Sequence, residues 1–151
     1  MLNGEFQHSL DDKGRLVFPM RFRLLLGEKF IITRGLHGCL FVFPTQEWNA
    51  FEQKLKEQPL LDLNAIKLQR FFSGSACEVS VDSQNRVQIP AGLREYAGIR
   101  SDVVVVGATN RVELWSRERW DAILDEISSP EAIAGAAQAI GLSSAVNAPP
   151  A

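Results

Sequence analysis

Two ten-residue stretches of this chain match each other position by position, and this repeat constrains the fold more than any other feature. The first is Leu-Asp-Asp-Lys-Gly-Arg-Leu-Val-Phe-Pro at residues 10–19, and the second is Val-Asp-Ser-Gln-Asn-Arg-Val-Gln-Ile-Pro at residues 81–90. Matched positions differ by a constant offset of 71 residues (82 − 11 = 71; 90 − 19 = 71). A constant offset across otherwise dissimilar residues indicates an internal repeat.

Each stretch predicts a strand, a tight turn and a second strand. Gly14 and Asn85 are residue types that accept positive φ at low cost, and a three-residue loop ending in such a residue is a common hairpin connection. The acid and the base that flank each loop, Asp11–Arg15 and Asp82–Arg86, should therefore face each other. Such a pair contributes only about 0.2–1 kcal/mol, but it would hold an arginine at a loop tip.

The residues after each loop repeat as well. A proline, Pro19 or Pro90, suits the start of a short helix, and a glycine, Gly27 or Gly98, suits its end. Paired strands and a closing helix follow in both copies, where Thr45 and Ser116 are candidate helix caps. The expected strands are Phe30–Thr33 with Cys39–Phe43, and Val103–Val106 with Val112–Trp115.

The predicted fold is mainly β with short helices, in the α+β class. Four short strands with one buried face do not form a stable sheet alone. We expect the two repeats to interlock into one pseudo-symmetric β-barrel with exchanged hairpins, because closure removes sheet edges. The predicted organisation is repeat 1 at 5–47, a helical connector at 48–76, repeat 2 at 77–120, and a C-terminal helix with a tail of low information at 121–151. We expect a helix over Leu63–Phe72, and a weak alanine-rich helix with a frayed end after Ser128.

Composition is that of a globular protein, with 46% apolar and 23% charged residues among 151. No apolar run is long enough to cross a membrane, and the N-terminus lacks a signal-peptide pattern, so we expect a cytoplasmic protein. The net charge of −2 argues mildly against a nucleic-acid partner. The distribution weakens this objection, because residues 1–34 sum to +2 (6 − 4) and residues 117–151 to −3 (2 − 5).

Several classes of function lack support in the sequence. Cys39 and Cys77 lie in predicted strands and are interpreted as buried small hydrophobic residues. His8 and His37 are too few and too scattered for a metal site; His8 lies near the first loop, where a surface position is favoured over a nucleic-acid contact. No catalytic arrangement or phosphate-cradling glycine loop is present. We therefore expect no enzyme, no cofactor, no metal and no small-molecule substrate.

Five runs resemble the MraZ family of bacterial proteins, which carry two SpoVT/AbrB-type domains in one chain. The similarity extends from about Met1 to Ile127 and includes an Asp-x-x-x-Arg signature in each copy. The second copy has Asn85 where glycine is usual in the family, and asparagine tolerates the same turn. The runs are His8-Ser-Leu-Asp-Asp-Lys-Gly-Arg15, Thr33-Arg-Gly-Leu-His-Gly-Cys-Leu40, Phe71-Phe-Ser-Gly-Ser-Ala76, Leu93-Arg-Glu-Tyr-Ala-Gly98 and Glu113-Leu-Trp-Ser116.

This resemblance implies a transcriptional regulator of the division and cell-wall gene cluster that encodes it, typically a repressor. Such proteins bind tandem repeats in double-stranded promoter DNA, assemble into ring-shaped homo-oligomers and associate with the nucleoid. Their Asp-x-x-x-Arg loops read the DNA, which implicates Asp11, Arg15, Asp82 and Arg86.

The residues themselves support particular roles within such an interface. An arginine at a loop tip can fork onto guanine in the major groove, which is the commonest specific base contact. Lys13 and Arg21 could neutralise phosphates, and their counterparts Gln84 and Gly92 could not, so the first loop should bind phosphate more strongly. Asp11 and Asp82 are expected to orient arginine rather than touch DNA.

Two alternatives stay open at this point. Arg23 and Arg94 match each other in the short helices, where a role in the fold is favoured over a role in DNA binding. The chain as a whole could also be a ring-forming structural protein without DNA specificity.

Overall fold

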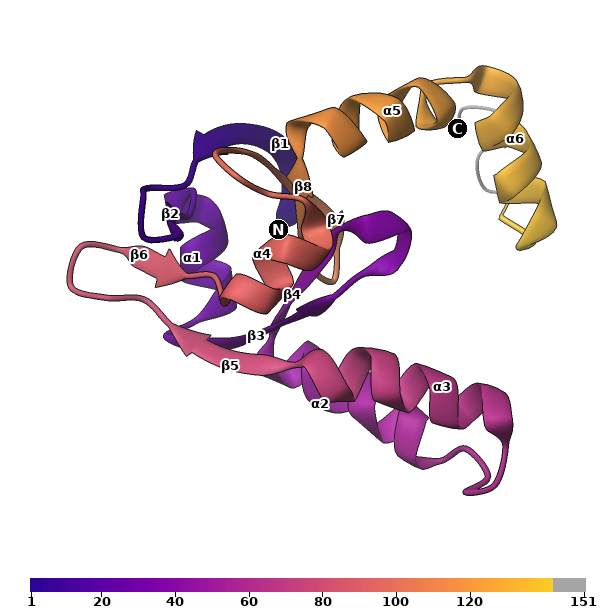
Figure 1. Ribbon diagram of the computed structural model, residues 1–151. Coiled ribbons are helices and arrows are strands. Elements are labelled where there is room, and N and C mark those ends of the chain that lie inside the picture. Colours follow the sequence, from indigo (N-terminus) through magenta and orange to yellow (C-terminus); the bar gives the residue numbers. More distant parts are fainter. Residues whose placement is uncertain (143–151) are drawn as a thin grey trace. The chain divides into compact units, whose positions relative to one another are not determined.

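The computed structural model describes residues 1–142 of the chain (Figure 1). The mainly β fold with short helices is confirmed, and so is the helix predicted over Leu63–Phe72. In chain order the elements are β1 (Leu2–Ser9), β2 (Arg15–Val17), α1 (Met20–Leu26), β3 (Lys29–Arg34), the 3₁₀ turn η1 (Leu36–Gly38), β4 (Leu40–Pro44), α2 (Thr45–Lys56), α3 (Leu63–Phe72), the 3₁₀ turn η2 (Ser73–Ser75), β5 (Cys77–Ser80), β6 (Arg86–Gln88), α4 (Ala91–Ala97), β7 (Asp102–Thr109), β8 (Val112–Ser116), α5 (Arg117–Ile127) and α6 (Pro130–Ala139).

The chain divides after Arg117 into two compact units. The first unit, Met1–Arg117, holds every strand of the described residues, and the second begins at Glu118 and contains most of α5 and all of α6. A helix lies after Ser128, as expected, and Ser129 caps it by accepting a hydrogen bond from the N–H of Ala132. The frayed end that we predicted lies outside the described residues. Within residues 1–142, no helix combines the length and the apolar character that crossing a bilayer would require.

Strands from both repeats interleave in one six-stranded antiparallel sheet, in the order β1-β7-β8-β4-β3-β5. Each strand has a counterpart in the other repeat: β1 corresponds to β5, β2 to β6, β3 to β7 and β4 to β8. When every strand is replaced by its counterpart, the same strand order is obtained, read from the opposite edge of the sheet. The register obeys the same rule, because Leu40 lies opposite Leu114 and Val42 opposite Val112. An offset of 72 residues converts one pair into the other (40 + 72 = 112; 42 + 72 = 114). The molecule therefore contains a pseudo-twofold relation between its repeats.

The predicted hairpins around the two loops are wrong in one respect. The strands on either side of each loop do not pair with each other: β1 pairs with β7, β5 pairs with β3, and β2 pairs with β6. Each partner therefore comes from the other repeat. The exchange buries the central residues of the β2–β6 ribbon, Leu16 and Val87, completely.

The predicted closed barrel is not confirmed. β1 and β5 form the two edges of the six-stranded sheet, and β2 and β6 form a separate two-stranded ribbon. Proline has no N–H to donate to a ladder, and Pro19 and Pro90 follow β2 and β6 after one further residue. These prolines limit the ribbon to three residues on each strand.

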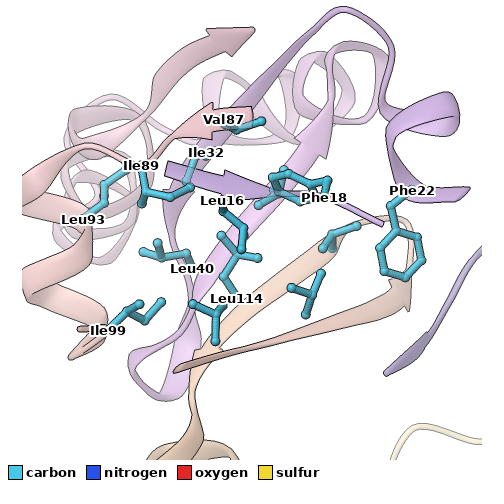
Figure 2. Close-up of a cluster of buried hydrophobic side chains, with 14 of the residues drawn as sticks. Leu16, Phe18, Phe22, Ile32, Leu40, Val87, Ile89, Leu93, Ile99 and Leu114 are labelled. Carbon is cyan, nitrogen blue, oxygen red and sulfur yellow. The ribbon is translucent and has the colours of Figure 1, made fainter. Parts of the chain in front are cut away.

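The hydrophobic core is built from both repeats. Figure 2 shows side chains of the ribbon, the sheet and α4 gathered in one cluster. Leu16 and Phe18 of the first repeat lie in this cluster with Val87 and Ile89 of the second, all at most 3% exposed. Because this burial needs both repeats, the ribbon that carries the loops is fixed to the body of the protein from both sides.

The long helices of the first repeat form a pair beside this core. Asp62 caps α3 by accepting hydrogen bonds from the N–H groups of Asn64 and Ala65. Thr45, the expected cap of α2, is instead its first helical residue and donates its hydroxyl to the carbonyl of Lys29 at 3.0 Å. Pro44 occupies the cap position and fixes where α2 leaves the sheet.

Candidate nucleic-acid interface

The first loop is closed by Asp11, which binds three partners at the start of β2. Its Oδ2 lies 2.6 Å from Arg15 Nε, so the predicted ion pair is confirmed. Its Oδ1 accepts the N–H groups of Lys13 and Arg15, both at 2.9 Å. The backbone N–H of Asp11 donates to the carbonyl of Arg15 and that of Gly14 to the carbonyl of Asp11. The loop is a tight turn held by one carboxylate.

The second loop has the same construction. Asp82 Oδ2 lies 2.8 Å from Arg86 Nε, and Oδ1 accepts the N–H groups of Gln84 and Arg86. The residue before each arginine has positive φ, with 77° at Gly14 and 61° at Asn85. Asparagine therefore takes the conformation that glycine takes in the first loop, as the sequence predicts.

These contacts change the acidity of both carboxylates. The pKa of Asp11 lies below its ordinary value of 3.8, chiefly because the carboxylate accepts the backbone N–H of Arg15. The pKa of Asp82 is lowered for the same main reason, the backbone N–H of Arg86. Both side chains remain charged at neutral pH and keep their arginines oriented.

The β2–β6 ribbon brings the two loops onto one surface. Arg15 lies opposite Gln88, Leu16 opposite Val87 and Val17 opposite Arg86. Since Leu16 and Val87 point into the core, their neighbours on both strands point to the other face of the ribbon. Arg15 and Arg86 are diagonal neighbours on that outer face, and such neighbours are usually separated by about 7–8 Å. Two arginines that are 71 residues apart in sequence (86 − 15) thus share one face.

The other residues predicted for this site divide into two groups. Lys13 lies in the first loop, next to the Asp11–Arg15 pair, with an exposed side chain. Arg21, in contrast, donates to the carbonyl and to the side-chain oxygen of Asn3, and its guanidinium lies 5.6 Å from the ring centre of Phe6. Arg21 is therefore bound to β1 rather than gathered with the loop arginines.

The matched pair Arg23 and Arg94 behaves asymmetrically. Arg94 Nε donates to the carbonyl of Ile89 at 3.0 Å, and its guanidinium covers Gly14, because a Cβ at Gly14 would lie 2.5 Å from Arg94 Cζ. Arg23 Nε is buried and has no hydrogen-bond partner within the described residues.

Sequence reasoning missed one residue next to the loops. Gln88 Nε2 donates to the carbonyl of Lys13 at 2.7 Å, which ties the second repeat to the first loop. The only sequence signal was the mismatch at this position, because the offset of 71 places Gln88 against Val17 (88 − 71 = 17).

The remaining candidates lie in strands or turns of the fold. Cys39 is fully buried, and burial raises the pKa of its thiol, which disfavours the reactive thiolate. Cys77 is a free, half-buried thiol on β5. His8 is half-buried on β1, opposite Val103. His37 lies in η1 with positive φ.

Comparison with known proteins identifies the family. The chain matches the family model described as "MraZ protein, putative antitoxin-like" twice, over residues 1–71 and 71–142. The chain belongs to the MraZ family. Among its MraZ relatives is the "Transcriptional regulator MraZ" of Halothermothrix orenii, 46% identical over 143 residues, which cover 94% of this chain and 100% of that protein. The "Transcriptional regulator MraZ" of Heliobacterium modesticaldum is 53% identical over 120 residues, covering 80% and 84% of the two chains.

The family assignment agrees with the resemblance noted in the sequence. Each match spans one repeat, and the second extends beyond Ile127 through α6. The family match therefore includes α6, whereas the similarity seen in the sequence motifs ends at about Ile127.

Proposed function

We propose that the chain is a transcriptional regulator that binds specific sequences in double-stranded DNA through its two Asp-x-x-x-Arg loops. One observation carries this proposal: Arg15 and Arg86 share the outer face of the β2–β6 ribbon. The names of the relatives, transcriptional regulators of the MraZ family, support the same class of function.

The ion pairs leave the arginines suited to base recognition. Asp11 and Asp82 occupy the Nε positions of Arg15 and Arg86, at 2.6 and 2.8 Å. The two terminal nitrogens of each guanidinium then form an end-on fork that matches O6 and N7 of guanine. A good bidentate contact supplies about 1–3 kcal/mol of discrimination against the wrong base.

The targets that we propose are tandem repeats in the promoter of the division and cell-wall gene cluster, where binding would repress transcription. The protein would then act in the cytoplasm, in association with the nucleoid. Two base-reading arginines in one chain give weak specific binding, and several linked copies on tandem sites would multiply it. We therefore propose a ring-shaped homo-oligomer. Exposed leucines on α3 and on the segment before it offer apolar surface for contacts between copies: Leu60, Leu61, Leu63 and Leu68.

The decisive experiment replaces both arginines. Arg15→Ala with Arg86→Ala should abolish specific binding to a duplex that the wild-type protein enriches from a random library, while the circular dichroism spectrum stays unchanged. Lys56→Ala with Lys67→Ala is the control, because it also removes two positive charges, from exposed positions on α2 and α3. If the arginine variant binds the duplex as tightly as wild type, the assignment of the site is wrong.

A ring-forming structural protein without DNA specificity is the alternative. Salt separates the two functions, since phosphate contacts make DNA binding weaken steeply as salt rises, whereas a purely structural protein would bind no duplex. Lys13→Ala should lower affinity about equally for all sequences and reduce the slope of log K against log salt by about 0.9.

A further inference from the structure

We infer that Gln88 is a positioning residue that holds the first loop in its DNA-reading form, whereas the second loop has no such support and adjusts when DNA binds. This inference rests on the proposed function, because it concerns the two loops that we propose as DNA readers. It states that the first loop is held in its binding conformation before DNA arrives and the second is not. It follows from a difference between two sites that the pseudo-twofold relation would otherwise make equivalent.

Three contacts from the second repeat hold the first loop. The side chain of Gln88 donates to the carbonyl of Lys13 at 2.7 Å, and the backbone N–H of Ile89 donates to the carbonyl of Gly14 at 3.0 Å. The guanidinium of Arg94 covers Gly14 and leaves it buried. Two consecutive carbonyls of the loop are thus fixed directly before Arg15.

Among residues 1–142, no side chain gives the second loop the matching support. Val17 occupies the position that corresponds to Gln88, and an aliphatic side chain cannot donate to the carbonyl of Gln84. Arg23 corresponds to Arg94 (94 − 71 = 23), and its buried Nε has no acceptor within the described residues. Asn85 is half-buried where Gly14 is fully buried.

The surroundings of the second loop also leave it room. A hollow of about 410 Å³ lies beside it, lined among others by Arg23, Lys29, Asp82 and Ser83. A loop with fewer hydrogen bonds and open space beside it samples more conformations, and binding must then order it. The second loop therefore orders more than the first on binding DNA.

The test exchanges the two matched residues. Gln88→Val gives the first loop the residue of the second, and Val17→Gln makes the reciprocal change. Both lie on the exposed face of the ribbon, so the melting temperature should stay close to that of wild type. Gln88→Val should weaken binding to the library-enriched duplex about three- to tenfold, the worth of one hydrogen bond, and speed amide exchange at Lys13 and Gly14 in the free protein.

A double-mutant cycle shows whether Gln88 acts through the first loop. Gln88→Val should cost nothing further in an Arg15→Ala background and keep its full effect in an Arg86→Ala background. Equal losses in both backgrounds would mean that Gln88 touches DNA directly, and unchanged amide exchange would mean that it does not hold the loop; either result overturns the inference. If Arg15→Ala alone leaves binding intact, the proposed function itself fails, whatever Gln88 does.

Discussion

At the scale of single residues, the loop aspartates are bound more by the backbone than by their arginines. Asp11 and Asp82 each accept two backbone N–H groups in addition to the guanidinium. A carboxylate beside DNA repels phosphate, so its value lies in shaping the loop and orienting arginine. The pKa of each aspartate should therefore depend little on the arginine that it orients.

A pH titration tests this view of Asp11. Its carboxyl should titrate below 3.8, and in Arg15→Ala it should keep most of this depression, because the backbone N–H groups remain. The folded-state pKa is lowered, so the stability from this group is fully present above 3.8 and is lost as pH falls through the lower folded value. NMR titration of the carboxyl carbon measures the midpoint, and a return to 3.8 in Arg15→Ala would assign the effect to the guanidinium.

Gly14 is required both by its conformation and by its neighbour. Gly14→Ala places a Cβ at φ 77° and against Arg94, whereas Gly98→Ala meets left-handed backbone at φ 66° in an exposed position. The backbone strain costs about 1–2 kcal/mol at either position. Gly14→Ala should therefore lower the free energy of unfolding more than Gly98→Ala does, as measured by urea denaturation. Equal losses would show that Arg94 moves aside freely.

At the scale of elements, two glycines, Gly4 and Gly107, lie opposite each other in the ladder between β1 and β7. A Cβ added at Gly107 would lie 2.4 Å from the backbone nitrogen of Asn3, and a backbone atom cannot turn aside as a side chain can. The pairing of β1 with β7 therefore depends on the absence of a side chain at Gly107.

Gly107→Ala should consequently destabilise the protein by about 1–3 kcal/mol, the usual range for forced overpacking. Gly92→Ala is the matched control, since Gly92 lies in α4 with open space around it, where alanine should stabilise the helix by up to about 1 kcal/mol. Thermal unfolding should therefore show a lower melting temperature for Gly107→Ala and a higher one for Gly92→Ala. A neutral Gly107→Ala would show that β1 can shift without loss.

The local parts of this fold could be predicted from the sequence, and the partners of the strands could not. The ion pair of Asp11 and Arg15 joins residues four apart, so turn chemistry specifies it. The contact of Gln88 with Lys13 joins residues 75 apart, and it exists only because β2 pairs with β6. Alternating apolar residues show which face of a strand is buried, but they do not show which strand lies beside it. The interleaving of the two repeats could be expected from the pattern, but the partner of each strand and the open sheet could not.

At the scale of the whole molecule, neither repeat can form its share of the sheet alone. Within residues 1–142, β1 pairs only with β7 and β5 only with β3, so each half supplies an edge strand whose partner comes from the other half. The core is shared in the same way, with Leu16 and Val87 packed in one cluster. The sequence repeat is therefore not a folding unit.

Fragments test this dependence directly. When the chain is divided between α3 and β5, each half alone should lack the near-ultraviolet circular dichroism of a packed core, because its apolar face has no cover. An equimolar mixture should recover the signal, with β1 pairing to β7 between the fragments. A half that unfolds cooperatively by itself would contradict this expectation.

The pseudo-twofold relation between the two repeats has a further consequence, which concerns the origin of the chain. A strand order that reads the same after the repeats are exchanged is what two identical polypeptides produce when they dimerise about a twofold axis. In such a dimer every substitution appears in both subunits, so the two Asp-x-x-x-Arg loops must remain identical in sequence. When the two copies are joined in one chain, each copy can change its sequence independently. The difference between Gln88 and Val17 could not arise in a homodimer, because its two subunits share one sequence.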